Sequence, residues 1–90
     1  MLKWVDSAKC DLYDIQLFMV DKDARAGMGL AVKIAQKAEV LSSQPYLGRV
    51  GAIEGTREWP IPGLPYKLVY WIKGDTVEIL RVIHQARDWP

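Results

Sequence analysis

Residues 67–84 read KLVYWIKGDTVEILRVIH, and this stretch decides the fold. Two runs rich in β-branched and aromatic residues flank Gly74 and Asp75, a pattern that is typical of a β-hairpin. Gly74 can adopt the positive φ that a primed turn requires, and Asp75 tolerates it. The stretch therefore predicts antiparallel strands at 67–73 and 76–84, joined by a two-residue loop.

A two-residue loop also predicts the pairing: Lys73 with Thr76, Trp71 with Glu78, Val69 with Leu80, and Lys67 with Val82. Side chains alternate across a strand, so each face can be written out. The face predicted to lie on the core is almost wholly apolar and holds Tyr66, Leu68, Tyr70, Ile72, Val77, Ile79, Arg81 and Ile83. The opposite face is mixed and holds Lys67, Val69, Trp71, Lys73, Thr76, Glu78, Leu80, Val82 and His84. A three-residue loop would invert this assignment.

Upstream of the hairpin, residues 56–61 predict a short strand that prolines interrupt near its end. Residues 42–55 are rich in Ser, Pro and Gly and predict a loop. At the start of the chain, residues 2–5 predict a first strand, which either lies at a sheet edge or inserts among the later strands. At the end, residues 85–90 are too short for a stable helix, and Trp89 is expected to fold back onto apolar surface.

Residues 6–41 predict a helical hairpin with one apolar side. Asp6 or Ser7 can cap the first helix, and Asp23 can cap the second after a break at 21–23. The first apolar stripe is Ala8, Leu12, Ile15 and Met19, widened by Tyr13, Leu17 and Val20. The second stripe is Ala24, Met28, Ala31, Ile34, Ala35, Ala38 and Leu41.

Composition narrows the class of protein. Ninety residues, half of them hydrophobic, indicate one folded domain over residues 1–90. Twelve basic residues against eleven acidic ones argue against a protein that grips nucleic acid mainly by charge. The single cysteine, Cys10, excludes an internal disulfide, and the N-terminus lacks a long apolar run. We therefore expect a cytoplasmic protein without a membrane span, a metal site or a cofactor.

The predicted order is strand, helix, helix, strand, strand, strand. This is an α+β fold in which a helical hairpin packs on one face of a twisted, mostly antiparallel sheet. Four sequence motifs accompany it in order: L-S-x-x-P-x-L-G-R at 41–49, G-T-R-E at 55–58, Y-x-L-V-Y at 66–70 and I-L-R-V-I-H-Q at 79–85. Together they resemble the RelE/ParE superfamily, the toxin subunits of type II toxin–antitoxin modules. The resemblance covers essentially the whole chain.

The resemblance implies a growth inhibitor that is neutralised by a cognate antitoxin, with roles such as plasmid maintenance, and that takes no small-molecule substrate. ParE-like members poison DNA gyrase, whereas RelE-like members are endoribonucleases that cleave mRNA on the ribosome. A degenerate toxin that retains only antitoxin binding is a third reading. The target has to be argued from the site, because one fold serves several functions.

Ribosome-dependent cleavage needs a base, an acid and cations for the phosphate. The residues that could supply them here are His84, Arg57, Lys67, Arg81 and Arg87. Lys67 stands where the ribonuclease form of the family motif has an arginine, and an ammonium cannot make the bidentate contact of a guanidinium. The lysine cluster that the family's ribonucleases place on the strand at 56–61 is largely absent, so gyrase is the preferred target.

Several of these residues also have structural explanations. Arg81 falls on the predicted core face, where an unpaired charge is costly, so we expect it to pair with Asp11 or Asp14. Arg57 and Glu58 can form a solvated pair. Antitoxin binding is predicted on the mixed face of the hairpin and the adjoining strand, at Val69, Trp71, Leu80, Val82, Lys67, Lys73 and Arg57.

Overall fold

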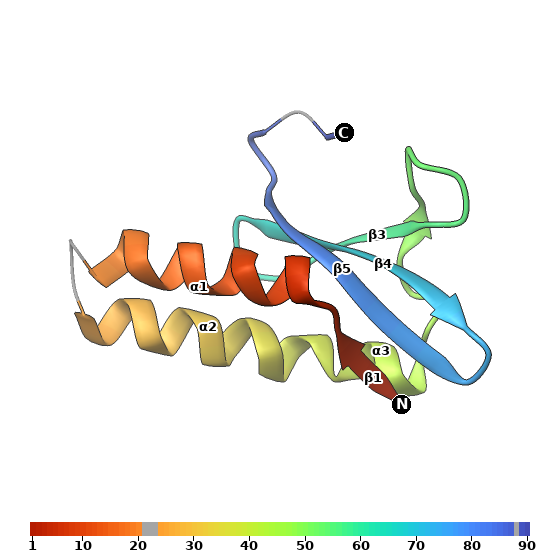
Figure 1. Cartoon of the computed structure of the whole chain (residues 1–90), viewed down its shortest axis with the longest axis horizontal. Helices are drawn as coiled ribbons and strands as arrows, with labels where there is room; N and C mark the ends of the chain where they lie inside the picture. Colours follow the sequence, from red (N-terminus) through yellow and green to blue (C-terminus); the bar gives the residue numbers. More distant parts are fainter. Residues whose placement is uncertain (21–23, 88) are drawn as a thin grey trace.

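The computed structural model describes residues 1–20, 24–87 and 89–90, and it describes no side chains for residues 19–20 and 24–28. Its elements, in chain order, are β1 (Leu2–Trp4), α1 (Asp6–Val20), α2 (Ala24–Ala38), α3 (Val40–Ser43), β2 (Arg49–Val50), β3 (Arg57–Pro60), β4 (Tyr66–Lys73) and β5 (Thr76–His84). The helices cover one face of a five-stranded sheet (Figure 1). The predicted α+β layout is confirmed, with α3 and β2 as additions.

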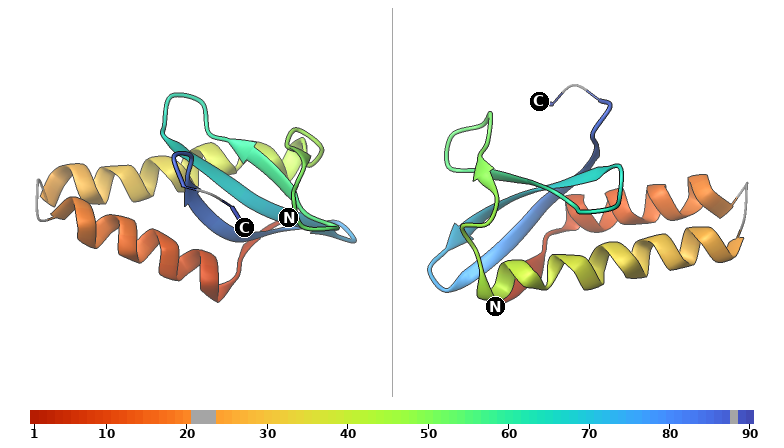
Figure 2. Two further views of the ribbon diagram at one scale, coloured as in Figure 1. Left: turned by 90° about the horizontal axis from the view of Figure 1, so that it is seen from above. Right: turned by 180° about the vertical axis from the view of Figure 1, so that it is seen from behind.

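The sheet has the strand order β1-β5-β4-β3-β2, and Figure 2 shows it from two further sides. The first strand, whose place the sequence left open, lies at the edge and runs parallel to β5, with Leu2 opposite Val77. The other neighbouring strands are antiparallel. β2 forms the opposite edge inside the segment predicted to be a loop.

The β4–β5 hairpin begins as predicted. Lys73 lies opposite Thr76, and Trp71 lies opposite Glu78. Gly74 has a φ of 61°, whereas no non-glycine residue in the described part of the chain has a positive φ. Only the first loop position is therefore left-handed, which is the pattern of a type II′ turn rather than a type I′ turn.

The predicted pairing fails one step further along, because β5 contains a bulge. After Tyr70 pairs with Ile79, the next pair is Val69 with Arg81, so Leu80 is an extra residue on β5. The predicted pairs Val69–Leu80 and Lys67–Val82 are wrong. An extra residue exchanges the two faces of the strand beyond it.

The exchange of faces moves the last residues of β5. Val82 joins the core cluster below the helices, contrary to the prediction that it lies on the mixed face. Arg81 pairs with Val69 and therefore lies on the face opposite the helices, so its predicted place on the core face is wrong. His84 pairs with Tyr66 and thus shares the helix-bearing face.

Val5 and the first turns of α1 satisfy the edge of β5 at the bulge and just beyond it. Ile79 C=O accepts from Val5 N–H at 3.1 Å, and Leu80 C=O accepts from the Ser7 hydroxyl at 2.7 Å. One turn later, Asp11 Oδ2 accepts from Val82 N–H at 2.8 Å. Residues four apart share one helix face, so Ser7 and Asp11 satisfy the backbone groups that β1 is too short to reach. Because α1 begins at Asp6, Ser7 lies inside the helix and is not its cap, contrary to one of the two predicted caps.

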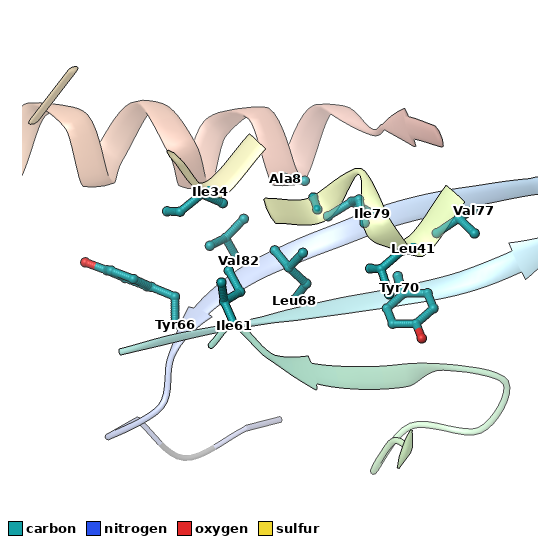
Figure 3. Close-up of a cluster of buried hydrophobic side chains, with 11 residues drawn as sticks. Ala8, Ile34, Leu41, Ile61, Tyr66, Leu68, Tyr70, Val77, Ile79 and Val82 are labelled. Carbon is teal, nitrogen blue, oxygen red and sulfur yellow. The ribbon is translucent and has the colours of Figure 1, made fainter. Parts of the chain in front are cut away.

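The core lies between this sheet and the helices (Figure 3). It is built from Ala8, Ile34, Ala38, Leu41, Ile61, Tyr66, Leu68, Tyr70, Val77, Ile79 and Val82. Leu41 belongs to α3, because α2 ends at Ala38. Tyr13 and Leu17 are exposed, so the predicted widening of the α1 stripe is wrong for these two residues. The predicted cap Asp23 lies outside the described residues, as do the side chains of Met19, Val20, Ala24 and Met28.

We expect Asp11→Ala to destabilise the protein by about 2–3 kcal/mol, because it leaves the Val82 N–H and the Arg81 guanidinium without their acceptor. Arg81→Ala should cost only about 1 kcal/mol, since the Arg81 side chain is 39% exposed and solvent screens the pair. Urea denaturation of both variants measures this difference. Asp14→Ala, an exposed acid on the same helix, is the control and should melt like the parent. Equal losses for Asp11→Ala and Arg81→Ala would show that the ion pair, rather than the edge hydrogen bond, carries the stability.

Candidate functional site

Three of the five predicted catalytic residues come together in a groove between α1 and the end of β5. The groove has a volume of about 560 Å³. His84, Arg81 and Arg87 line one side of it, and Asp11 and Asp14 of α1 line the other. Apolar side chains complete the lining: Ile15, Phe18, Tyr66, Val82, Ile83 and Ala86.

His84 is held at the end of β5 by two contacts. Its Nδ1 accepts a hydrogen bond from Ala86 N–H at 3.1 Å, so the neutral ring carries its proton on Nε2. The ring meets Tyr66 edge to face, with a centroid separation of 5.2 Å. Nε2 is therefore the nitrogen that His84 can offer to a partner.

Arg81 is engaged by Asp11, as the sequence predicted. Arg81 Nε and Nη2 donate to the two carboxylate oxygens at 2.7 and 3.2 Å. This hydrogen bonding raises the pKa of the guanidinium, although burial acts in the opposite direction. The guanidinium also lies 5.4 Å from the centroid of the Trp89 ring. Trp89 thus folds back onto the Arg81 guanidinium rather than onto purely apolar surface as predicted. The C-terminus lies on the side of the sheet away from the helices (Figure 1).

Lys67 lies outside the groove and is neutralised by a buried acid. Its ammonium donates to Glu58 Oε1 at 2.8 Å, and Glu58 Oε2 accepts from Ala52 N–H at 2.9 Å. Burial raises the pKa of Glu58, but the bonds from Lys67 and Ala52 and the charges of Lys67 and Arg49 outweigh it, so the pKa is lowered. The predicted solvated pair of Arg57 with Glu58 is therefore wrong.

Arg57 is directed to the other face of the sheet and away from the groove. It pairs with Tyr70 across β3 and β4, on the helix-bearing face. Its Nη1 donates to Gly48 C=O at 2.7 Å, and its guanidinium lies 4.9 Å from the Tyr46 ring centroid. Arg57 and Lys67 thus stand on opposite faces, so the five predicted residues do not form one site.

The predicted antitoxin-binding residues are also divided by the bulge. Val82 is 5% exposed in the core, and Val69 is 1% exposed on the opposite face. Trp71, Leu80 and Lys73 keep accessible surface. The Trp71 indole N–H donates to Glu78 Oε1 at 2.6 Å, and Lys73 Nζ lies 4.3 Å from the Trp71 ring. The seven residues therefore do not form one continuous exposed surface.

Two features of the described residues were not visible in the sequence. Asp11 accepts a backbone hydrogen bond as well as pairing with Arg81, and only the bulge creates that demand. Glu58 bridges Lys67 to the loop at Ala52, and no local pattern predicts this contact. Within the described residues, no group of acids, histidines and cysteines could hold a metal ion. None of the described helices is long and apolar enough to cross a membrane.

We expect Glu58→Gln to destabilise the protein by about 3 kcal/mol at neutral pH, because it strands the Lys67 ammonium. The folded pKa of Glu58 lies below its ordinary value of 4.5, so its stabilisation is present above pH 4.5 and is lost as the pH falls through the folded pKa. Urea denaturation at pH 7 and pH 3 should show the gap between parent and variant narrowing at pH 3. Glu54→Gln, an exposed change nearby, is the control. A gap of equal size at both pH values would rule out the ion pair as its source.

Comparison with known proteins gives a consistent result. Residues 2–89 match the family model described as the ParE toxin of the type II toxin–antitoxin system parDE. The Sinorhizobium fredii protein named "Putative toxin Y4kP" is 33% identical over 89 residues, which cover 99% of this chain and 92% of the relative.

Two solved structures are similar in fold. A chain of the chromosomal ParDE system from P. aeruginosa superposes with a TM-score of 0.83 at 23% identity, covering 92% of both chains. A chain of the toxin–antitoxin complex RelBE2 from Mycobacterium tuberculosis gives a TM-score of 0.68 at 26% identity, covering 93% of this chain and 95% of that one. The fold, the family model and the relative agree, and the chain belongs to the ParE toxin family of type II toxin–antitoxin systems.

Proposed function

We propose that this toxin inhibits growth by binding a protein target, DNA gyrase, and that a cognate antitoxin neutralises it. The observation that carries the proposal is the state of the cations. Arg57, Lys67 and Arg81 each already donate hydrogen bonds to an acceptor of the same chain, namely Gly48 C=O, Glu58 and Asp11 respectively. A ribonuclease needs such cations directed at a scissile phosphate.

The ion pair between Lys67 and Glu58 is costly to break. Glu58 is buried, and withdrawing the ammonium would leave that carboxylate unpaired at a cost of about 3 kcal/mol. Substrate binding would have to supply this free energy before any catalysis began. A toxin that acts by binding makes no such demand on Lys67.

Support for gyrase comes from the family, because ParE-like members act on it and the chain matches the ParE model. One observation favours the alternative, a ribosome-dependent endoribonuclease. The groove brings His84, Arg81 and Arg87 together, and a histidine beside cations is suited to acid–base work on RNA. The likeness to the RelBE2 chain concerns the fold that both classes share.

His84→Ala should leave growth inhibition largely intact under the binding proposal, provided that the variant is folded. An acid–base residue would instead contribute about 10²–10⁴-fold to the rate. The measurement pairs a supercoiling assay with purified gyrase and primer extension on cellular mRNA after toxin expression. His84→Gln, which keeps a polar side chain, serves as the matched control. Cleavage at codon positions with normal supercoiling, abolished by His84→Ala, would replace gyrase with the ribosome.

For the antitoxin we propose that the exposed part of the hairpin, around Trp71 and Lys73, is an anchor. Glu78 and Lys73 hold the Trp71 ring from two sides, so little side-chain entropy is lost when a partner covers it. Aromatic residues held in this way are common binding hot spots. The solved relatives come from toxin–antitoxin systems, which makes an antitoxin the expected partner.

Trp71→Ala should weaken antitoxin binding by about 2 kcal/mol or more, since it removes a central aromatic anchor. Calorimetric titration against the purified antitoxin measures the change, with folding checked by circular dichroism. Trp71→Phe keeps an aromatic ring and should lose less affinity for the antitoxin than Trp71→Ala. If Trp71→Ala bound the antitoxin with the parent's affinity, the antitoxin would have to bind elsewhere on the toxin, with the two helices as the next surface to test.

A further inference from the structure

Exposed large hydrophobic side chains concentrate on one short segment at the β2 edge of the sheet. Of the nine in the described residues, four fall within residues 46–53: Tyr46, Leu47, Val50 and Ile53. We call residues 45–56 the edge loop. It includes β2, and the turn between β2 and β3 projects away from the helices (Figures 1 and 2). Neither the groove nor the proposed antitoxin anchor includes any of its residues.

Buried polar side chains hold the edge loop in one conformation. The Tyr70 hydroxyl donates to Pro45 C=O and accepts from Gly48 N–H, both at 2.8 Å. Thr56 Oγ1 donates to Ile53 C=O at 2.6 Å, which closes the turn between β2 and β3. Arg57 and Glu58 add the bonds to Gly48 and Ala52 described above. Side chains of β3 and β4, together with Thr56 of the loop itself, therefore hydrogen-bond the loop backbone at Pro45, Gly48, Ala52 and Ile53.

The loop sits close against these side chains. A Cβ on Gly48 would lie 2.6 Å from the Tyr70 hydroxyl, and a Cβ on Gly51 would lie 2.6 Å from Thr56 Oγ1. Both positions thus require glycine for close approach. A loop fixed this firmly, yet carrying exposed apolar side chains at its surface, is preorganised for binding and loses little entropy when a partner covers it.

The charges around the loop indicate the chemistry of the partner. Arg49 is exposed, and Arg57 lies against the exposed Tyr46 ring. Of the nearby acids, Glu58 is neutralised by Lys67, which leaves Glu54 to offset two arginines. Tyrosine and arginine among aliphatic residues are the composition of protein-binding hot spots. A surface gripping RNA would be more strongly basic.

We propose that the edge loop is the surface by which the toxin grips its protein target, through an apolar recess bordered by carboxylates. The inference rests on the proposed function, namely that the toxin acts by binding. A second copy of the chain is a weaker fit, because β2 spans only two residues and offers few backbone hydrogen bonds for edge pairing. The target contact thus lies at the opposite edge of the sheet from β1.

The test compares two polar substitutions with a matched control. The double variant Val50→Ser, Ile53→Ser removes apolar surface from the edge loop. Val32→Ser changes a valine on α2 that is 55% exposed, comparable to Val50 at 76%. The readouts are growth inhibition on expression, inhibition of gyrase supercoiling and affinity for the antitoxin, with circular dichroism as the folding check.

The concentration of toxin that half-inhibits gyrase should be at least about tenfold higher for the double variant than for the parent. The double variant should also fail to inhibit growth on expression. Its antitoxin affinity and that of Val32→Ser should stay within about twofold of the parent's, and Val32→Ser should remain toxic. Retained toxicity in the folded double variant would overturn the proposal, as would equal loss in both variants.

Other outcomes separate the inference from the proposed function. A parent that inhibits growth without affecting gyrase, while the double variant is harmless, would refute gyrase and support the edge loop as the contact with another protein. If Arg49→Ala abolished growth inhibition and target binding fell steeply with salt, while the double variant stayed toxic, the target would be RNA. That result would overturn the proposal. A parent that sediments as a dimer and a double variant that sediments as a monomer would assign the edge loop to self-association and also overturn it.

Discussion

The hydrogen bonds from Val5 and the start of α1 to the bulged edge of β5 are the constraint on which the rest of the structure depends. The bulge at Leu80 directs the carbonyls of Ile79 and Leu80 to the same edge, where Val5 N–H and the Ser7 hydroxyl meet them. Asp11 then accepts Val82 N–H. These bonds fix the position of α1 against the sheet. The bulge itself fixes which residues after Leu80 enter the core.

The sequence predicts the hairpin up to the bulge and no further. Its period of two and the Gly74-Asp75 turn pair Trp71 with Glu78 correctly. The sequence around Leu80 does not predict a bulge, because the run is uniformly rich in strand-forming residues and has no glycine or proline. One extra residue exchanges the faces, so Val82 and His84 were assigned to the wrong side. An acid partner for Arg81 was nevertheless predicted, with Asp11 as one of two candidates, because a partly buried guanidinium requires an acid on whichever face it lies.

The candidate site was less predictable than the fold, because its properties depend on pairing across strands. Composition shows that the charges nearly balance, but it cannot show which cations are neutralised. Glu58 is nine residues from Lys67, and the two meet only because β3 and β4 are neighbours. A list of catalytic candidates drawn from residue type therefore overstates the available chemistry. In the folded chain, three of the four cations among those candidates, Arg57, Lys67 and Arg81, already have partners.

These pairings also show what the polar side chains of the sheet contribute. Tyr70 lies on β4, and Arg57 and Glu58 lie on the neighbouring strand β3, with side chains on both faces of the sheet. All three make hydrogen bonds to the segment from Pro45 to Ala52. A catalytic sheet would leave such groups free to meet a substrate, at the cost of a loosely held edge. Here they rigidify backbone, and the side chains that remain exposed on that backbone are mostly apolar. Polar side chains that hold the backbone and apolar side chains exposed on it suit recognition of another protein better than proton transfer, since recognition depends on fixed shape and desolvation.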